Sequence, residues 1–303
     1  MINWATLAIF SSLIFSFVAV IDKYLLGHSL PNVRIFYCIV GLIQILMALI
    51  ILIIFPWQSN PPATTLIISI FSGAMWGAGL ILMFFGMSKL EVSRVVPINH
   101  TYPVFVTIMA VGFLGEQLSL TQSIGILVAV SGAALITIRP NKASNNIGNP
   151  KIYSLVFLGS FFTATALVTY KYALDDIHFW NLTAIRSFSL GGILLIGGYH
   201  HSLMESLRTT TRKSWGPLYM LVFAEAVLAP VGMITQLQSL ALGPVSLAST
   251  LMSIRPFFVL IISGVLSTKH LSFLDEPIDR RTLPVKLFST ILIFIGVCLI
   301  TLY

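Results

Sequence analysis

Two stretches decide the fold: residues 89–119, KLEVSRVVPINHTYPVFVTIMAVGFLGEQLS, and residues 242–272, LGPVSLASTLMSIRPFFVLIISGVLSTKHLS. They align without a gap, and 8 of the 31 aligned positions are identical, including Pro103 with Pro256 and Phe105 with Phe258. One stretch lies in each half of the 303-residue chain. The alignment therefore predicts an internal repeat.

The composition around these stretches is that of a membrane protein. Hydrophobic residues make up 57% of the chain and charged residues only 9%, whereas a soluble domain carries roughly 25% charged residues. The apolar residues form blocks of about twenty, the length of a helix that crosses a ~30 Å hydrocarbon layer. We expect an all-α polytopic membrane protein with ten spans: 4–26, 33–55, 64–87, 95–114, 120–138, 152–174, 179–199, 215–241, 246–267 and 284–302.

The repeat and the span count together predict an inverted architecture. Each half contains five spans, an odd number, so the second copy must cross the membrane upside down. Lys23-Tyr24 in the first half also matches Lys171-Tyr172 in the second. We expect a first five-helix repeat over 1–140, a linker over 141–151 and a second, inverted repeat over 152–303.

The basic residues predict the orientation. Of the 17 lysines and arginines, 14 fall in the loops after odd-numbered spans, and such loops stay cytoplasmic. Both termini should therefore lie on the non-cytoplasmic side of a cell (inner or plasma) membrane. The basic residues are scattered over short loops and form no single patch, so we expect no nucleic-acid partner.

Several short motifs resemble those of a known family. In the first half these motifs are Leu90-Glu91-Val92-Ser93, Pro97, Pro103, Gly115-Glu116-Gln117-Leu118-Ser119, Gly125 and Gly132. The chain thus resembles the EamA-type transporters of the drug/metabolite transporter superfamily. The second half departs from this pattern, because it has Thr268-Lys269 at the position of Gly115-Glu116 and an insertion near 273–283. That resemblance implies a ten-helix transporter that moves a small metabolite, often outward, by alternating access.

Polar residues at membrane depth are candidates for function, because each needs a partner or a role there. In span eight, Glu225, Ala229, Gly232 and Gln236 share one helical face. Their counterparts in span three are Ser72, Trp76, Gly79 and Met83. We expect these faces to line a central cavity, although the two glycines alone favour close helix packing.

Spans four and nine add further candidates. Glu225 and Arg255 lie at similar depth, about 15 Å from opposite helix ends, and could form either a structural ion pair or a substrate or proton site. His100 could bind substrate or a proton, or simply hydrogen-bond to a neighbouring helix. Glu225 and His100 are the coupling candidates. The predicted cavity residues are Trp76, Asn99, His100, Tyr102, Glu225, Gln236, Ser253 and Arg255.

Two other polar residues are expected to be structural. Glu116 lies in a loop, before a capping box that Ser119 and Gln122 should form at the start of span five. Arg186 lies near the predicted outer end of span seven, where its side chain should snorkel to the interface.

The function predicted from these features is transport. The sequence contains no phosphate-binding loop, HExxH or GxSxG motif, so we expect no enzyme activity, no metal and no cofactor. The leading hypothesis is a secondary transporter that exports amino acids or related small polar compounds, with protons as the candidate coupling ion. An uptake permease or exchanger for a nucleotide-like or organic-cation solute is the alternative, and a receptor or scaffold is an alternative of another class. We expect a monomer or a weak homodimer in contact with membrane lipid.

Overall fold

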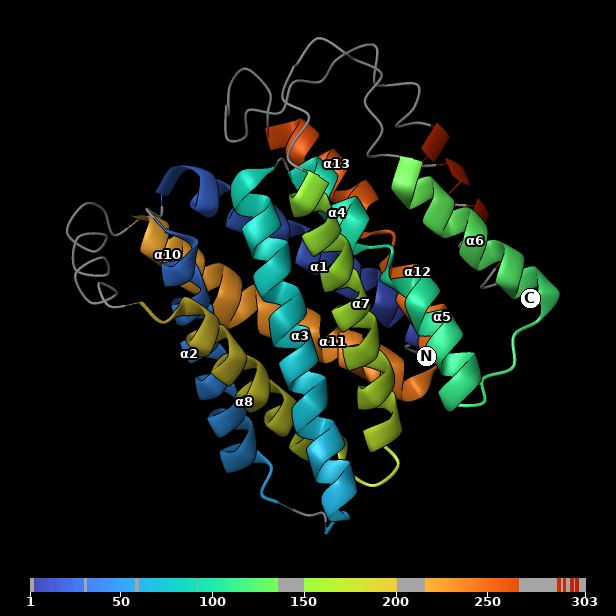
Figure 1. The fold of residues 1–303 in the computed structure, drawn as a ribbon, viewed down its shortest axis with the longest axis horizontal. Coiled ribbons are helices and arrows are strands. Elements are labelled where there is room, and N and C mark those ends of the chain that lie inside the picture. Colours follow the sequence, from blue (N-terminus) through green and yellow to red (C-terminus); the bar gives the residue numbers. More distant parts are fainter. Residues whose placement is uncertain are drawn as a thin grey trace.

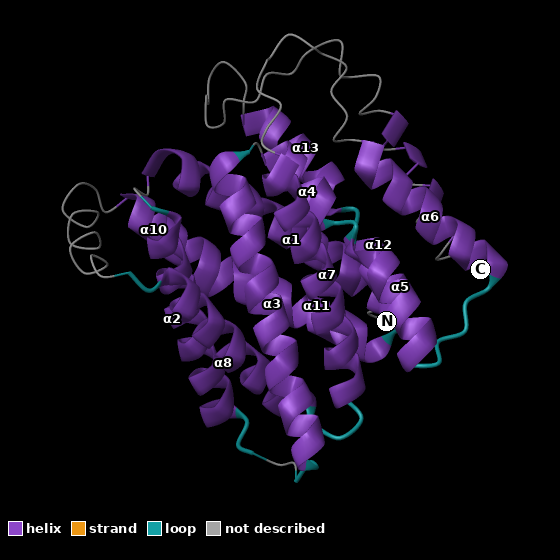
Figure 2. Ribbon diagram, viewed as in Figure 1, coloured by secondary structure: helices purple, strands orange, loops and turns teal. Residues whose placement is uncertain are grey.

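The structure, a computed structural model, describes residues 3–29, 32–57, 60–90, 92–135, 150–200 and 216–266, with the pairs 288–289, 291–292, 295–296 and 298–299. Within these residues all regular structure is helical (Figure 2). The elements are α1 (Trp4–Tyr24), η1 (Leu25–Ser29), α2 (Val33–Ile54), α3 (Ala63–Lys89), α4 (Val92–Asn99), α5 (Tyr102–Phe113), α6 (Leu120–Leu135), α7 (Pro150–Ala173), α8 (Phe179–Gly198), α10 (Gly216–Phe223), η2 (Ala224–Leu228), α11 (Ala229–Leu242), α12 (Val245–Met252) and α13 (Arg255–Leu266).

Eight stretches of helix are long and apolar enough to cross a membrane: Trp4–Gly27, Val33–Ile54, Ala63–Lys89, Val95–Phe113, Pro150–Ala173, Phe179–Gly198, Gly216–Leu242 and Val245–Ile262. They correspond to eight of the predicted spans. The span predicted over 120–138 is a shorter apolar helix, Leu120–Gly132. Most of the span predicted over 284–302, and most of the predicted linker 141–151, lie outside the described residues. The count of ten therefore stays a prediction.

Helix starts follow the local sequence. The predicted capping box of α6 is confirmed: the Ser119 amide donates to Gln122 Oε1 (3.0 Å), and the Gln122 amide donates to Ser119 Oγ (3.1 Å). At α2 the side chain of Asn32 accepts a hydrogen bond from the Arg34 amide (3.0 Å). Each contact satisfies a backbone group that the first helical turn leaves without a partner.

Spans four and nine are each broken into two helices at equivalent positions. The first break falls at His100-Thr101, between α4 and α5, and the second at Ser253-Ile254, between α12 and α13. A proline has no N–H, so Pro256 leaves the carbonyl oxygen four residues earlier without its helical donor. Ser12 Oγ donates to that oxygen, on Met252, at 3.1 Å. A neighbouring helix thus replaces the missing hydrogen bond, as membrane helices require.

The helices pack in two groups (Figure 1). In one, α3 lies against α7 and α8, and α2 lies against α8; in the other, α1 lies against α11, α12 and α13. Glycine permits a close approach between α2 and α8. A Cβ at Gly191 would lie 2.6 Å from the Gly41 carbonyl oxygen, and one at Gly41 would lie 2.9 Å from that of Gly191. Small residues at such crossings let membrane helices pack backbone to backbone.

Two lysines join these groups in equivalent ways. Lys23, near the end of α1, donates to carbonyl oxygens at the end of α3, and Lys171, near the end of α7, donates to those at the end of α11. The acceptors are Met87 (2.8 Å) and Leu90 (2.9 Å) for Lys23, and Leu240 (2.8 Å) and Gly243 (3.1 Å) for Lys171. Met87 and Leu90 occupy the same repeat positions as Leu240 and Gly243.

The two lysine contacts lie at opposite ends of the α3–α7 pair. These helices run antiparallel, because Thr65 at the start of α3 hydrogen-bonds to Asp176, just beyond α7, while Ser72 bonds to Ala166. Lys171 therefore lies near the start of α3, whereas Lys23 lies at its end. A cation at a helix C-terminus also interacts favourably with the helix dipole.

Candidate functional site

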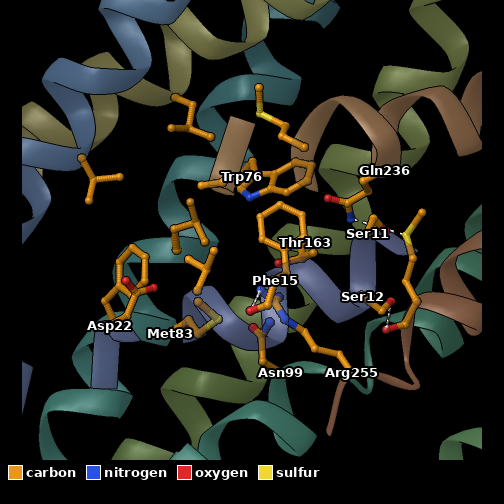
Figure 3. Close-up of a pocket in the computed structure, with 18 of the residues that line it drawn as sticks. Ser11, Ser12, Phe15, Asp22, Trp76, Met83, Asn99, Thr163, Gln236 and Arg255 are labelled. Atoms are coloured by element: carbon orange, nitrogen blue, oxygen red, sulfur yellow. Dashed lines mark hydrogen bonds between the residues drawn. The ribbon is translucent and has the colours of Figure 1, made fainter. Parts of the chain in front are cut away.

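A cavity lies between the two groups of helices (Figure 3), with space of about 80 Å³ for the centres of water-sized molecules. A single water needs roughly 10–15 Å³ on this measure, so the cavity has room for a small solute. Seven of the predicted site residues line it: Trp76, Asn99, His100, Tyr102, Glu225, Gln236 and Arg255. They come from α3, the α4–α5 break, η2, α11 and α13, so the structure brings together residues from both halves.

Ser253 is the predicted residue that the structure places outside the lining. It is fully buried, and its hydroxyl donates to the Thr250 carbonyl oxygen at 2.6 Å. The break between α12 and α13 interrupts the helical periodicity on which its placement depended. The side chain satisfies its own helix and does not face the cavity.

The matched glycines serve packing. A Cβ at Gly79 would lie 3.0 Å from the Gly159 carbonyl oxygen on α7, and one at Gly232 would lie 3.1 Å from the Ile14 side chain on α1. The close-packing interpretation of both glycines is therefore confirmed. The residues beside them, Trp76 and Gln236, face the cavity.

Sequence reasoning missed Asp22, which lies on α1 and lines the cavity at 2% exposure. Its carboxyl group is hydrogen-bonded to that of Glu225, which is 3% exposed. An ionised carboxylate only accepts hydrogen bonds, so a bond between two carboxyl groups requires a proton on one of them. The two carboxyl groups therefore form one pair in the wall of the cavity.

Glu225 owes its position to an irregular turn. It lies in η2, a five-residue π-helical segment between α10 and α11. Such turns are rare, occur mostly as single-turn bulges within α-helices, and are frequent at functional sites. Asp22 immediately precedes the end of α1, where η1 begins another π-helical turn. Glu225 therefore lies within an interruption of the regular helix, and Asp22 lies just before one.

Arg255 faces the same cavity, and its charge interacts with those of Asp22 and Glu225 without an ion pair to Glu225 in this conformation. Its Nη2 donates to the Phe15 carbonyl oxygen (2.9 Å), and its guanidinium lies 4.7 Å from the centre of the Phe15 ring. Within the described part of the chain, Arg255 Nε has no hydrogen-bond partner. The cavity thus presents a cation on α13 apart from the carboxyl pair on α1 and η2.

Other polar groups of the lining also lack partners among the described residues. They are both ring nitrogens of His100, Oδ1 of Asn99, Oε1 of Gln236 and Oε1 of Gln44. His100 packs its ring against Tyr102, with 5.3 Å between centroids. The idea that His100 only hydrogen-bonds to a neighbouring helix therefore finds no support. Buried polar groups normally have partners, so the lining of the cavity is unusual in its unsatisfied polar atoms.

The prediction for Arg186 is wrong. Its side chain does not reach the interface but is buried, at 1% exposure, with its guanidinium carbon 3.4 Å from the Trp76 ring centroid. The close approach of α8 to α3 causes this placement. A Cβ at Gly73 on α3 would lie 2.8 Å from the Ser189 side chain and 3.0 Å from Arg186 Cα. The side chain is thereby enclosed between helices.

Glu116 has the structural role expected of it, and it acts between the halves. Its carboxylate accepts hydrogen bonds from the Val245 amide (2.5 Å), the Ser246 amide (3.2 Å) and the Ser246 hydroxyl. These groups form the first turn of α12. A carboxylate there satisfies free amides and complements the helix dipole. Glu116 also interacts electrostatically with Lys171. Lys171 bonds to the end of α11 and Glu116 to the start of α12, so the two side chains hold both sides of the turn between these helices.

Comparison with known proteins identifies the class of the molecule. The EamA-like transporter family matches residues 2–138 and again residues 150–302. The chain therefore belongs to the EamA-like transporter family, within the drug/metabolite transporter superfamily. Together with the apolar helices, this membership indicates a multi-pass integral membrane transporter.

Individual relatives cover parts of the chain. An uncharacterized protein of Methanocaldococcus jannaschii is 28% identical over 102 residues, which are 34% of this chain and 74% of that protein. It is therefore less than half as long as this chain. A candidate sugar uptake protein of Listeria monocytogenes is 32% identical over 133 residues, 40% of this chain and 46% of its own length.

A solved structure shares the fold. The crystal structure of a protein with 14% sequence identity superposes on 99% of this chain and 98% of its own length, with a TM-score of 0.64. At this identity the likeness concerns the fold alone.

Proposed function

We propose that the protein is a secondary active transporter that exports a zwitterionic metabolite, such as an amino acid, by alternating access and in exchange for protons. The observation that carries this proposal is a single cavity with opposite charges that are not paired to each other. Arg255 stands on α13, and the carboxyl pair of Asp22 and Glu225 stands on α1 and η2. A zwitterion offers a carboxylate to the first and an ammonium group to the second.

The architecture we propose is two inverted five-helix repeats, ten helices in all, with the substrate near their interface. Four observations support it. The two lysine contacts and the two helix breaks fall at equivalent positions of the repeats, the family matches each half separately, and a relative exists at less than half the length. Both termini would lie outside the cytoplasm.

Proton coupling follows from the carboxyl pair. An ammonium group that binds between Asp22 and Glu225 would favour the ionised form of both groups and so displace the proton that they share. Substrate and proton would then occupy the site in turn, which is the requirement for exchange. We assign the protein no catalytic activity.

The test is counterflow in proteoliposomes that contain the purified full-length protein. Vesicles loaded with unlabelled alanine should take up labelled alanine faster than vesicles that contain Arg255→Gln or no protein. A pH gradient alone should drive accumulation. Absence of alanine and other amino-acid counterflow, with the protein shown to be folded, would refute the proposed substrate class.

A sugar is the second candidate substrate. The Listeria relative is described as a candidate for sugar uptake, and the cavity offers the Trp76 ring with the free amide oxygens of Asn99 and Gln236. Hydroxyl groups could donate to these oxygens. Glucose, choline and a nucleotide belong in the same counterflow panel, because faster exchange of any of them than of alanine would replace the amino acid as substrate.

A further inference from the structure

Arg186 on α8 is a cation buried among helices with its hydrogen-bonding groups unused. It is 1% exposed, and Nε, Nη1 and Nη2 all lack a hydrogen-bond partner in the described structure. A guanidinium offers five N–H donors in a planar fork. Burying such a group is unfavourable unless an anion or hydrogen-bond acceptors compensate for the lost water.

Two aromatic rings lie next to the guanidinium. Its central carbon lies 3.4 Å from the Trp76 ring centroid and 5.2 Å from the Tyr170 ring centroid. Cation–π attraction stabilises the charge, but ring faces do not accept a pair of N–H···O hydrogen bonds as a carboxylate does. The acidic groups of the cavity, Asp22 and Glu225, bond to each other. An anion for Arg186 must therefore come from outside this set.

Trp76 separates Arg186 from the cavity. Trp76 on α3 lines the cavity, and so does Leu190, one turn beyond Arg186 on α8, whereas Arg186 itself does not. The backbones of α3 and α8 are in close contact at Gly73, where a Cβ would lie 3.0 Å from Arg186 Cα. The helices hold the base of the arginine in place. If the Trp76 indole moved aside, the guanidinium of Arg186 could reach the cavity.

We propose that Arg186 is a second carboxylate-binding group of the transport site, covered by the Trp76 indole in this conformation and exposed to the cavity when the indole rotates. The proposal rests on the proposed function, because it assigns a partner to the carboxylate of the same substrate. A planar guanidinium binds a carboxylate through two parallel hydrogen bonds. The substrate would then have one arginine partner on α13 and another on α8, in the two groups of helices.

The test uses acetate as the probe, acetamide as its neutral isostere and the full-length protein in detergent micelles. The dissociation constant is obtained from the acetate dependence of the unfolding temperature. A covered site that opens in about 10% of molecules or fewer binds its ligand at least about tenfold more weakly than an open one. In the Arg255→Gln background, which lacks the carboxylate-binding group on α13, Trp76→Ala should therefore bind acetate at least about tenfold more tightly than Arg255→Gln alone, with no response to acetamide.

A third substitution assigns the effect. Arg186→Gln added to Trp76→Ala and Arg255→Gln should remove the gain in acetate affinity. An unchanged affinity on Trp76→Ala in the Arg255→Gln background, or a gain that survives Arg186→Gln, would overturn the proposal. If Trp76→Ala does not fold, Trp76→Phe should give a smaller gain in the same direction, and no gain would count against the proposal.

The outcome is separate from that of the proposed function. Counterflow of alanine by the wild type tests transport, and acetate binding by the Trp76 variants tests the second site. A protein that exchanges alanine but gains no acetate affinity on loss of the indole would refute the second site alone. A protein that gains affinity but exchanges no amino acid would refute the proposed substrate and retain the anion site.

Discussion

Replacement of Glu116 by Gln should destabilise the contact between the two halves. The carboxylate accepts three hydrogen bonds from the first turn of α12. Gln keeps one acceptor oxygen but loses the charge, and its NH₂ group faces donors. Hydrogen bonds to a charged group are worth about 1.5–3 kcal/mol, against about 0.5–1.5 kcal/mol for neutral ones. The carboxylate is half-buried, so solvent screens part of this difference, and we expect a loss of about 1–3 kcal/mol.

The assay is SDS titration of the purified protein, with the free energy of unfolding as the readout. Gln117→Ala is the matched control, because Gln117 is the exposed neighbour of Glu116 and surface substitutions usually change stability by less than about 0.5 kcal/mol. A double-mutant cycle with Ser246→Ala should show coupling, since the two side chains are in contact. A loss no larger than that of Gln117→Ala, or additive effects in the cycle, would refute this account of the helix cap.

Three further results are expected. Glu225→Gln should abolish accumulation driven by a pH gradient while counterflow persists. The free energy of unfolding should change little, because the Gln amide can still donate to Asp22. Normal gradient-driven accumulation would contradict proton coupling at this pair. Gly191→Ala should destabilise the protein by about 1–3 kcal/mol, because its Cβ would lie 2.6 Å from the Gly41 carbonyl oxygen. The control Gly192→Ala places its Cβ in open space and should be nearly neutral. Equal losses of stability in the two variants would disprove the packing argument. A reporter that is active only in the cytoplasm should be inactive when fused after Tyr303, and full activity there would reverse the predicted orientation.

Much of the fold could be predicted from local sequence. Runs of about twenty apolar residues set the spans, and the capping box of Ser119 and Gln122 depends only on residues three apart. The equivalence of the halves was visible in the alignment that pairs Pro103 with Pro256. These features are local in the chain or repeat along it, so no knowledge of packing is needed.

The errors concern how helices are rotated and which neighbours they meet. Depth along a helix brings Glu225 and Arg255 to the same level, but it leaves open whether the two side chains pair, and it does not show that Glu225 meets Asp22. Glu225 is a candidate because it is an ionisable group at membrane depth. Asp22 meets the same criterion, so the sequence alone could have identified it. Arg186 was misplaced because its burial depends on the close approach of α3 and α8 at Gly73, which the sequence of α8 does not reveal.

The lysine contacts have a consequence for how the two halves could diverge during evolution. Lys23 and Lys171 bind backbone carbonyl oxygens, which every residue type provides. Substitution at the end of α3 or α11 leaves such an acceptor in place as long as the helix still ends there. The halves can therefore share the Lys-Tyr pair although residues 87–90, MSKL, and 240–243, LALG, share no identity. A contact of this kind requires the lysine but allows substitutions in the segment that supplies the carbonyl oxygens.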